Sequence, residues 1–73
     1  MKLAYIFSEC EHNGDLANYE ECVIACGGKI LESYLNRDEE CTIIFEVDNR
    51  NEFEKKFKHS DAYDFSKLFF TQK

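Results

Sequence analysis

The sequence contains no proline and no tryptophan, only two arginines, and no apolar run long enough to cross a membrane. A membrane-spanning helix needs about 20 predominantly apolar residues. Basic residues are scarce as well, because 15 acidic residues outnumber nine basic ones and give a formal net charge of -6. Binding to nucleic acid depends on Lys and Arg side chains that neutralise phosphates, and anionic membranes attract positive charge too. The composition therefore argues against direct nucleic-acid or membrane binding and favours a basic protein as partner.

The N-terminus lacks the features of a secretory signal peptide. Its apolar run covers only residues 3–7, whereas a signal peptide has an apolar core of about 7 to 15 residues and a small-residue cleavage site. We therefore expect a cytoplasmic protein. Cysteines are normally reduced in that compartment, so the four cysteines are expected to be free thiols that pack as small apolar residues.

The periodicity of apolar residues predicts a single domain over residues 1–73 with four strands and two helices. Strands are expected at residues 2–8, 29–35, 41–47 and 63–71, where β-branched and aromatic residues gather. The first helix is expected from residue 15 to the Gly27-Gly28 pair, which favours a helix end. Its apolar residues recur at helical spacing at Leu16, Tyr19, Val23 and Cys26.

The second helix is predicted from a capping box, in which Asn49 precedes Glu52 by three residues. Phe53 and Phe57 then pair on one face, and the helix is expected to end at Ser60. The resulting order β-α-β-β-α-β is that of the α+β ferredoxin-like fold, a four-stranded antiparallel sheet with two helices on one face. This fold serves many unrelated functions, so it does not identify one.

Negative charge is unevenly distributed along the chain. Residues 1–48 hold eleven acids and three bases, whereas residues 49–73 hold four acids and six bases. In the predicted topology three connections meet at one end of the sheet. We expect seven acids to gather there: Glu9, Glu11, Asp15, Asp38, Glu39, Glu40 and Asp61. Such a surface either keeps a small protein soluble or attracts a positively charged partner.

The same connections carry a second candidate site. Cys10 and His12 lie in the first loop, and His59 is expected at the same end. Thiolate and imidazole together form a zinc-like ligand set. No pair of cysteines has the C-x-x-C spacing with which one loop grips a metal, so metal binding is carried only as the alternative and no cofactor is expected.

In size and element order the chain resembles the heavy-metal-associated domains, small metal carriers whose metal loop follows the first strand. Those domains have two cysteines at C-x-x-C in that loop, where this chain has Cys10 followed by His12. The resemblance implies a metal- or small-ligand-binding module. Catalysis is not expected, because Cys10 has no orienting group or oxyanion site in the sequence.

The face of the sheet away from the helices is a third surface of interest. Ile44 is expected there together with Ile6, Tyr34 and either Phe65 or Phe69. A contiguous apolar patch would mark an interface, and three uses are weighed: a homodimer, a small-ligand pocket, and stacking of nucleic-acid bases on strand aromatics. The aromatics considered for stacking are Tyr5, Phe7 and Phe45. The registers of the first and last strands stay open, since a slip of one residue exchanges the two faces.

The favoured function is a non-catalytic one. We expect a small acidic binding protein that docks through its clustered carboxylates on a basic surface of another protein and inhibits or adapts that protein. A nucleic-acid-binding groove is a natural target, because carboxylates present negative charge as phosphates do. In size and charge alone the chain is similar to phage-encoded inhibitors of host defence.

Overall fold

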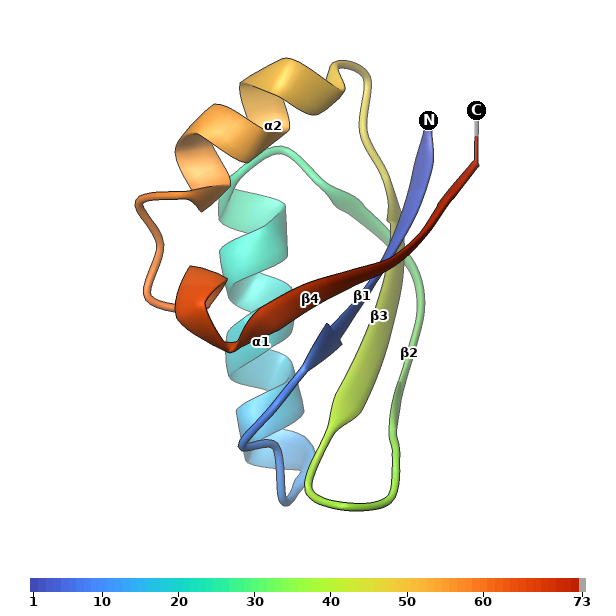
Figure 1. Ribbon diagram of the computed structural model, residues 1–73, viewed down its shortest axis with the longest axis vertical. Helices are drawn as coiled ribbons and strands as arrows, with labels where there is room; N and C mark the ends of the chain where they lie inside the picture. Colours follow the sequence, from blue (N-terminus) through green and yellow to red (C-terminus); the bar gives the residue numbers. More distant parts are fainter. Residues whose placement is uncertain (73) are drawn as a thin grey trace.

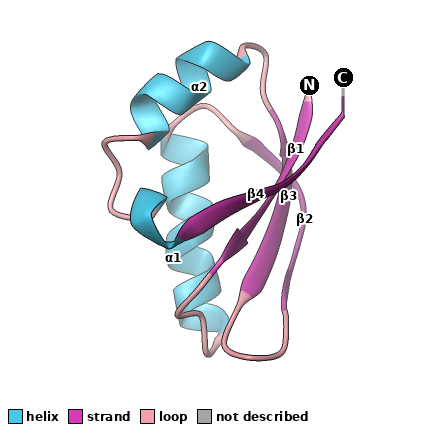
Figure 2. Ribbon diagram, in the orientation of Figure 1, coloured by secondary structure: helices cyan, strands magenta, loops and turns pink. Residues whose placement is uncertain are grey.

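The computed structural model describes residues 1–72 (Figure 1). Its elements, in chain order, are β1 (Lys2–Phe7), α1 (Asn13–Ala25), β2 (Lys29–Leu35), β3 (Cys41–Glu46), α2 (Arg50–Phe57), the 3-10 helix η1 (Tyr63–Phe65) and β4 (Ser66–Gln72). The strands form one sheet in the order β2-β3-β1-β4, with every neighbouring pair antiparallel. Both helices lie on the same side of this sheet (Figure 2). The predicted ferredoxin-like α+β architecture is confirmed.

The core lies between the sheet and the helices and consists largely of aromatic rings. In β1 and β3, Leu3 pairs with Phe45 and Tyr5 pairs with Ile43, which fixes the register that the sequence left open. Tyr5, Phe45 and Phe7 are all buried. They face the helices rather than the open side of the sheet, so the idea that they stack on nucleic-acid bases is wrong.

Helix α1 begins two residues earlier than expected because His12 caps it. The Nδ1 atom of His12 accepts a hydrogen bond of 3.2 Å from the backbone N–H of Gly14, which satisfies one of the free donors at a helix start. The helix ends before Gly27, whose φ of 101° favours glycine. Next to it, a Cβ atom on Gly28 would lie 2.5 Å from a methyl group of Val23, so this glycine permits close packing.

Helix α2 is short, and this determines where the next connection lies. The predicted cap is confirmed, since Oδ1 of Asn49 accepts from the backbone N–H of Glu52 at 3.1 Å. The eight residues of α2 span about 12 Å and the 13 residues of α1 about 20 Å, at 1.5 Å per residue. Because α2 ends early, residues 58–62 lie beside the middle of the molecule's long axis and not at its end (Figure 1). Neither helix of the described chain has the length and apolarity that a bilayer crossing requires.

The final strand starts later than predicted. Residues 63–65 form η1, in which the backbone N–H of Phe65 bonds to the carbonyl of buried Ala62 at 3.1 Å. Strand β4 then begins at Ser66, paired with Phe7. A register shift leaves Phe69 between the residues that pair with Ala4 and Tyr5, so β4 carries a bulge at that position.

Candidate functional site

Two of the three predicted connections come together at one end of the molecule. The β1–α1 connection and the β2–β3 turn lie side by side there (Figure 1), and the backbone N–H of Cys10 donates to the carbonyl of Glu39 at 2.8 Å. These segments carry six of the seven predicted acids. We call them the acidic end: Glu9, Glu11, Asp15, Asp38, Glu39 and Glu40.

Two kinds of carboxylate occur in the acidic end. Asp15 has a structural role, because its Oδ2 accepts from the backbone N–H of Glu11 at 3.0 Å and lies 3.6 Å from Nε2 of His12. It also stands in the first turn of α1, where negative charge is favourable. Four others are exposed, and within residues 1–72 their carboxylates have no hydrogen-bonding or ionic partner; they are Glu9, Glu11, Asp38 and Glu39.

Three of these exposed acids occupy backbone positions that disfavour a side chain. Glu9, Asp38 and Glu39 have φ values of 54°, 61° and 60°, and they are the non-glycine residues of positive φ in the part of the chain that the structure describes. The left-handed region costs an L-residue about 1–2 kcal/mol, whereas glycine enters it freely. Two successive positive φ values are the mark of a type I′ hairpin turn, which usually takes Asn-Gly or Asp-Gly. Acidic residues therefore occupy positions at which glycine would adopt the required backbone conformation at a lower free-energy cost.

The buried thiols of Cys10 and Cys41 hold the two connections together. Cys10 is 1% exposed and Cys41 is fully buried. Burial raises the pKa of Cys10, and burial together with the hydrogen bond to Cys10 raises the pKa of Cys41. A thiol that keeps its proton is a poor nucleophile and a poor metal ligand. Cys10 thus anchors the first connection beside β3.

Residues 58–62 of the third connection do not reach the acidic end, although at the close of that connection the carbonyl of Phe65 accepts from the backbone N–H of Ser8 at 2.9 Å. Asp61 and His59 lie in the 58–62 segment beside the middle of the long axis (Figure 1). The expectation that they share one end with Glu9 and Asp38 is therefore wrong. The shortness of α2 is the cause, since its last turn stops well before the level at which α1 begins.

The residues of the predicted metal site are also separated. Cys10 points into the core, His12 caps α1, and His59 belongs to the distant 58–62 segment. Among residues 1–72, no three His, Cys, Asp or Glu side chains are grouped in a way that suits a metal ion. The structure therefore does not bring the alternative ligand set together.

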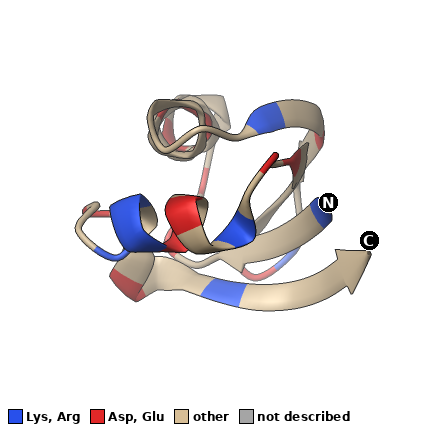
Figure 3. Cartoon of the chain, turned by 90° about the horizontal axis from the view of Figure 1, so that it is seen from above, with Lys and Arg blue, Asp and Glu red and all other residues tan. Residues whose placement is uncertain are grey.

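The opposite end of the molecule has a mixed charge. Along α2, positive and negative segments alternate in the view from that end (Figure 3). Arg50 and Glu54 form an ion pair there, with 2.6 Å between Nε and Oε1. At the acidic end the basic side chain is Arg37, which is exposed. The unbalanced negative charge is therefore concentrated at one end.

The open face of the sheet carries a small apolar area. Strand pairing places Ile6 and Ile44 on this face, and Tyr34 joins them across Thr42, as the sequence predicted. The edge residue is Phe70, which pairs with Ala4. Either Phe65 or Phe69 was expected in its place, but Phe65 lies in η1 and Phe69 at the bulge.

The left-handed positions are the feature of the acidic end that sequence reasoning missed. A run of Asn36-Arg37-Asp38-Glu39-Glu40 indicated a charged turn, but a turn without glycine gives no sign of positive φ. Comparisons with family models, with curated proteins and with solved structures found no match to this chain. What the acidic end binds is therefore inferred from its own geometry and charge.

Proposed function

We propose that this protein is a non-catalytic binding protein that docks through its acidic end on a basic surface of another protein. The observation that carries the proposal is the occupation of left-handed backbone positions by Glu9, Asp38 and Glu39. A surface that only keeps the protein soluble can carry its acidic residues at any exposed position. Exposed positions in helices or strands would carry them without backbone strain. Strained positions tend to serve function, and here the strain accompanies four exposed carboxylates.

The platform under these carboxylates is preorganised. Cys10 is buried beside Cys41, and the Cys10 N–H to Glu39 carbonyl bond ties the first connection to the hairpin turn. Fixing groups before binding reduces the entropy lost on association. The side chains themselves stay free to meet Lys and Arg groups of the partner, and such charge-assisted contacts are stronger than neutral hydrogen bonds.

A nucleic-acid-binding groove on the partner fits this surface best. Its Lys and Arg side chains are arranged for phosphates, and carboxylates on two adjacent connections offer charge of the same sign as phosphates. A docked copy of this protein would exclude nucleic acid, so inhibition is the expected consequence. Complementary charge mainly raises the association rate and specificity, which makes the interaction sensitive to salt.

The proposal is tested by affinity capture from the source cells or their host with three forms of the protein. The first is the wild type. The second carries Glu9→Gln, Asp38→Asn and Glu39→Gln at the acidic end. The third, a matched control, carries three neutralised acids that are exposed elsewhere: Glu21→Gln, Glu32→Gln and Glu46→Gln.

A basic protein is expected on the wild type and on the control, released by a high-salt wash and absent from the acidic-end variant. The two variants have the same net charge, so a general charge effect cannot separate them. Equal capture by both variants would remove the acidic end from the mechanism. Circular dichroism of each variant checks that the fold is retained.

A further inference from the structure

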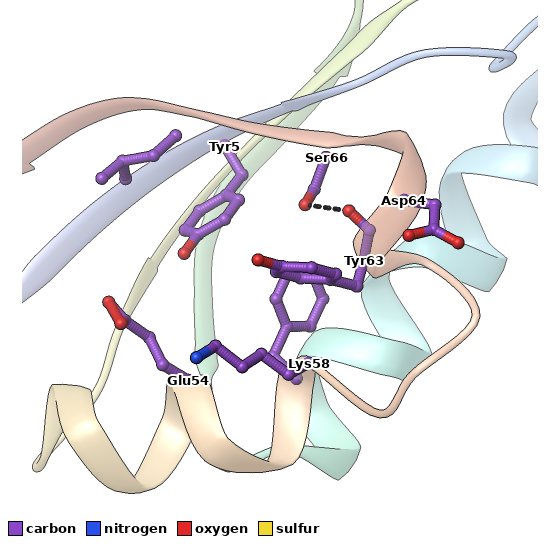
Figure 4. A pocket seen from close by; sticks show the side chains of 8 residues that line it. Tyr5, Glu54, Lys58, Tyr63, Asp64 and Ser66 are labelled. Atoms are coloured by element: carbon purple, nitrogen blue, oxygen red, sulfur yellow. Dashed lines mark hydrogen bonds between the residues drawn. The ribbon is translucent and has the colours of Figure 1, made fainter.

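A pocket near the middle of the molecule shares no residue with the acidic end. It lies between α2, η1 and β4, has a volume of about 390 Å3, and is lined by residues of all three elements together with Tyr5 of β1 (Figure 4). Ligand pockets typically measure about 300–1,000 Å3. This volume lies at the lower end of the range, which suits a small metabolite.

The hydroxyl of Tyr5 points into the pocket from the core. The Tyr5 ring packs among Phe7, Phe45, Phe53 and Phe57 and is 7% exposed. Tyr19, which is partly buried, donates its hydroxyl to the carbonyl of Ser8 at 2.8 Å. No such bond from Tyr5 exists to any group within residues 1–72. Phenylalanine would pack equally well at this position, so the hydroxyl has a use that the core does not require.

Three further polar groups converge with Tyr5 in the pocket. The hydroxyl of Tyr63 faces that of Tyr5, and the ends of Lys58 and Glu54 lie next to each other on the α2 side of the same pocket (Figure 4). The ammonium of Lys58 and the hydroxyl of Tyr63 take part in no ion pair or hydrogen bond with side chains of the described chain. The carboxylate of Glu54 is held in place by Arg50, whose Nε donates to Oε1 at 2.6 Å. The other carboxylate oxygen, Oε2, stays free. The pocket therefore places a positively charged donor, two hydroxyl groups and a negatively charged acceptor side by side.

The remaining walls consist of Asp64, of Ser66, whose hydroxyl donates to the carbonyl of Tyr63 at 2.7 Å, and of two apolar side chains. The Phe57 ring meets Tyr5 edge-on with 5.4 Å between centroids, and it meets Tyr63 in the same way at 5.8 Å. Leu68 of β4 lines the side of the pocket. These contacts hold both phenol rings at fixed angles, so their hydroxyls are positioned before a ligand arrives.

We propose that this pocket binds a small zwitterion with an apolar body, of the α-amino acid class. Lys58 and the hydroxyls of Tyr5 and Tyr63 receive the carboxylate, and Glu54 receives the ammonium. The apolar side chain of the ligand lies against Phe57 and Leu68. Two charged groups that are matched in one pocket discriminate against ligands that carry only one of them, because the bound ligand then desolvates the unmatched protein charge without compensation.

The test uses L-phenylalanine and L-leucine as ligands. Their binding is measured by calorimetry and by the amide chemical shifts of the 15N-labelled protein. Phenylacetate, which lacks the ammonium, and 2-phenylethylamine, which lacks the carboxylate, are the matched analogues. Saturable binding of at least one amino acid is expected, with shifts confined to residues 54–68 and to Tyr5. Each analogue is expected to bind about tenfold more weakly or worse, the ratio typical of a lost charged hydrogen bond.

Lys58→Met is expected to weaken binding about tenfold or more and Tyr63→Phe several-fold. Lys55→Met, which lies in α2 three residues before Lys58 and outside the pocket, is the control and leaves affinity unchanged, as do the acidic-end substitutions. Absence of saturable binding for both amino acids would overturn the proposal. Equal affinity for phenylacetate, or equal loss in Lys55→Met and Lys58→Met, would overturn it as well.

Discussion

At the scale of single residues, the side chains proposed to bind the partner lower the stability of the acidic end. Glu39 and Glu9 have positive φ values of 60° and 54°, which cost stability in any residue with a Cβ atom. Asp38 shares the conformation but suffers less, because Asp tolerates the left-handed region better than Glu does. The two glutamates are thus the positions where the fold gains most from glycine and where the proposed partner contact loses most.

Glu39→Gly is expected to raise the free energy of unfolding by about 0.5–1 kcal/mol, since relief of the left-handed backbone exceeds the added entropy of the unfolded chain. Urea unfolding with a shared m-value measures the change. Glu21→Gly, within the exposed part of α1, is the control and is expected to lose about 1 kcal/mol. A loss of stability in Glu39→Gly would show that the side chain supports the turn.

Buried ionisable groups make stability depend on alkaline pH. The pKa values of Cys41 and Cys10 are raised above the ordinary value of 9.0, and that of Tyr5 above 10.0, in each case first by burial. The unfolded chain releases these protons at the ordinary values while the folded chain retains them. Their contribution to stability is therefore complete below about pH 9 and is lost as pH rises toward the folded values.

Melting temperature is accordingly expected to fall steadily between pH 9 and pH 11. Cys41→Ala is expected to be less stable at pH 7, because it leaves a small cavity, and to show a shallower alkaline decline. Cys22→Ala, which removes a partly exposed thiol of α1, is the comparison and should retain the wild-type slope. An identical slope in all three proteins would contradict the assignment.

At the scale of elements, the sequence predicted most of what periodicity controls. The alternation of Ile43, Ile44 and Phe45 gave β3 its two faces, and the Asn49 cap located the start of α2. The 3-10 turn at residues 63–65 and the early end of α2 at Phe57 escaped prediction. Both depend on tertiary contacts such as the burial of Ala62, for which the local sequence has no signal.

The pocket residues were missed for a different reason. The available signal was a tyrosine in the first strand, since Tyr5 is the buried tyrosine among the described residues and packs among four phenylalanines. The sequence gives no means of knowing that Lys58 and Tyr63 approach the same point, because their proximity follows from the short α2 and from η1. Because the sequence prediction put the 58–62 connection at the end of the molecule, it did not identify the pocket. For the same reason it wrongly added Asp61 to the acidic end.

The open face of the sheet remains a predicted homodimer interface. Ile6, Ile44, Tyr34 and Phe70 form its apolar area, and charges of both signs surround it, at Lys2, Lys29, Glu32, Glu46 and Lys67. Such a mixture is self-complementary across a two-fold axis. Light scattering over a concentration series is expected to show a dimer for the wild type.

Ile44→Lys is expected to give a monomer, because a charge in the centre of the apolar area would be desolvated in the dimer. Ile24→Lys changes an α1 side chain that is 56% exposed and serves as the control that keeps the dimer. A wild type that stays monomeric at every concentration would rule out this use of the face.

At the scale of the whole molecule, the fold separates two surfaces. The acidic end combines the β1–α1 connection with the β2–β3 turn, and the pocket is built from α2, η1 and β4 with Tyr5 of β1. Different variants disable each surface, so the two proposals stand or fall independently. Unbalanced negative charge on a strained backbone is the most distinctive property of the chain, and it lies at the acidic end.

The most direct test is the salt dependence of affinity between this protein and the basic partner that it captures. The dissociation constant is expected to rise at least tenfold between 50 and 300 mM salt for the wild type and for the Glu21, Glu32 and Glu46 control, as screening predicts. The Glu9, Asp38 and Glu39 variant is expected to bind weakly at low salt with little further dependence. Equal affinities and slopes in all three proteins would contradict docking through the acidic end.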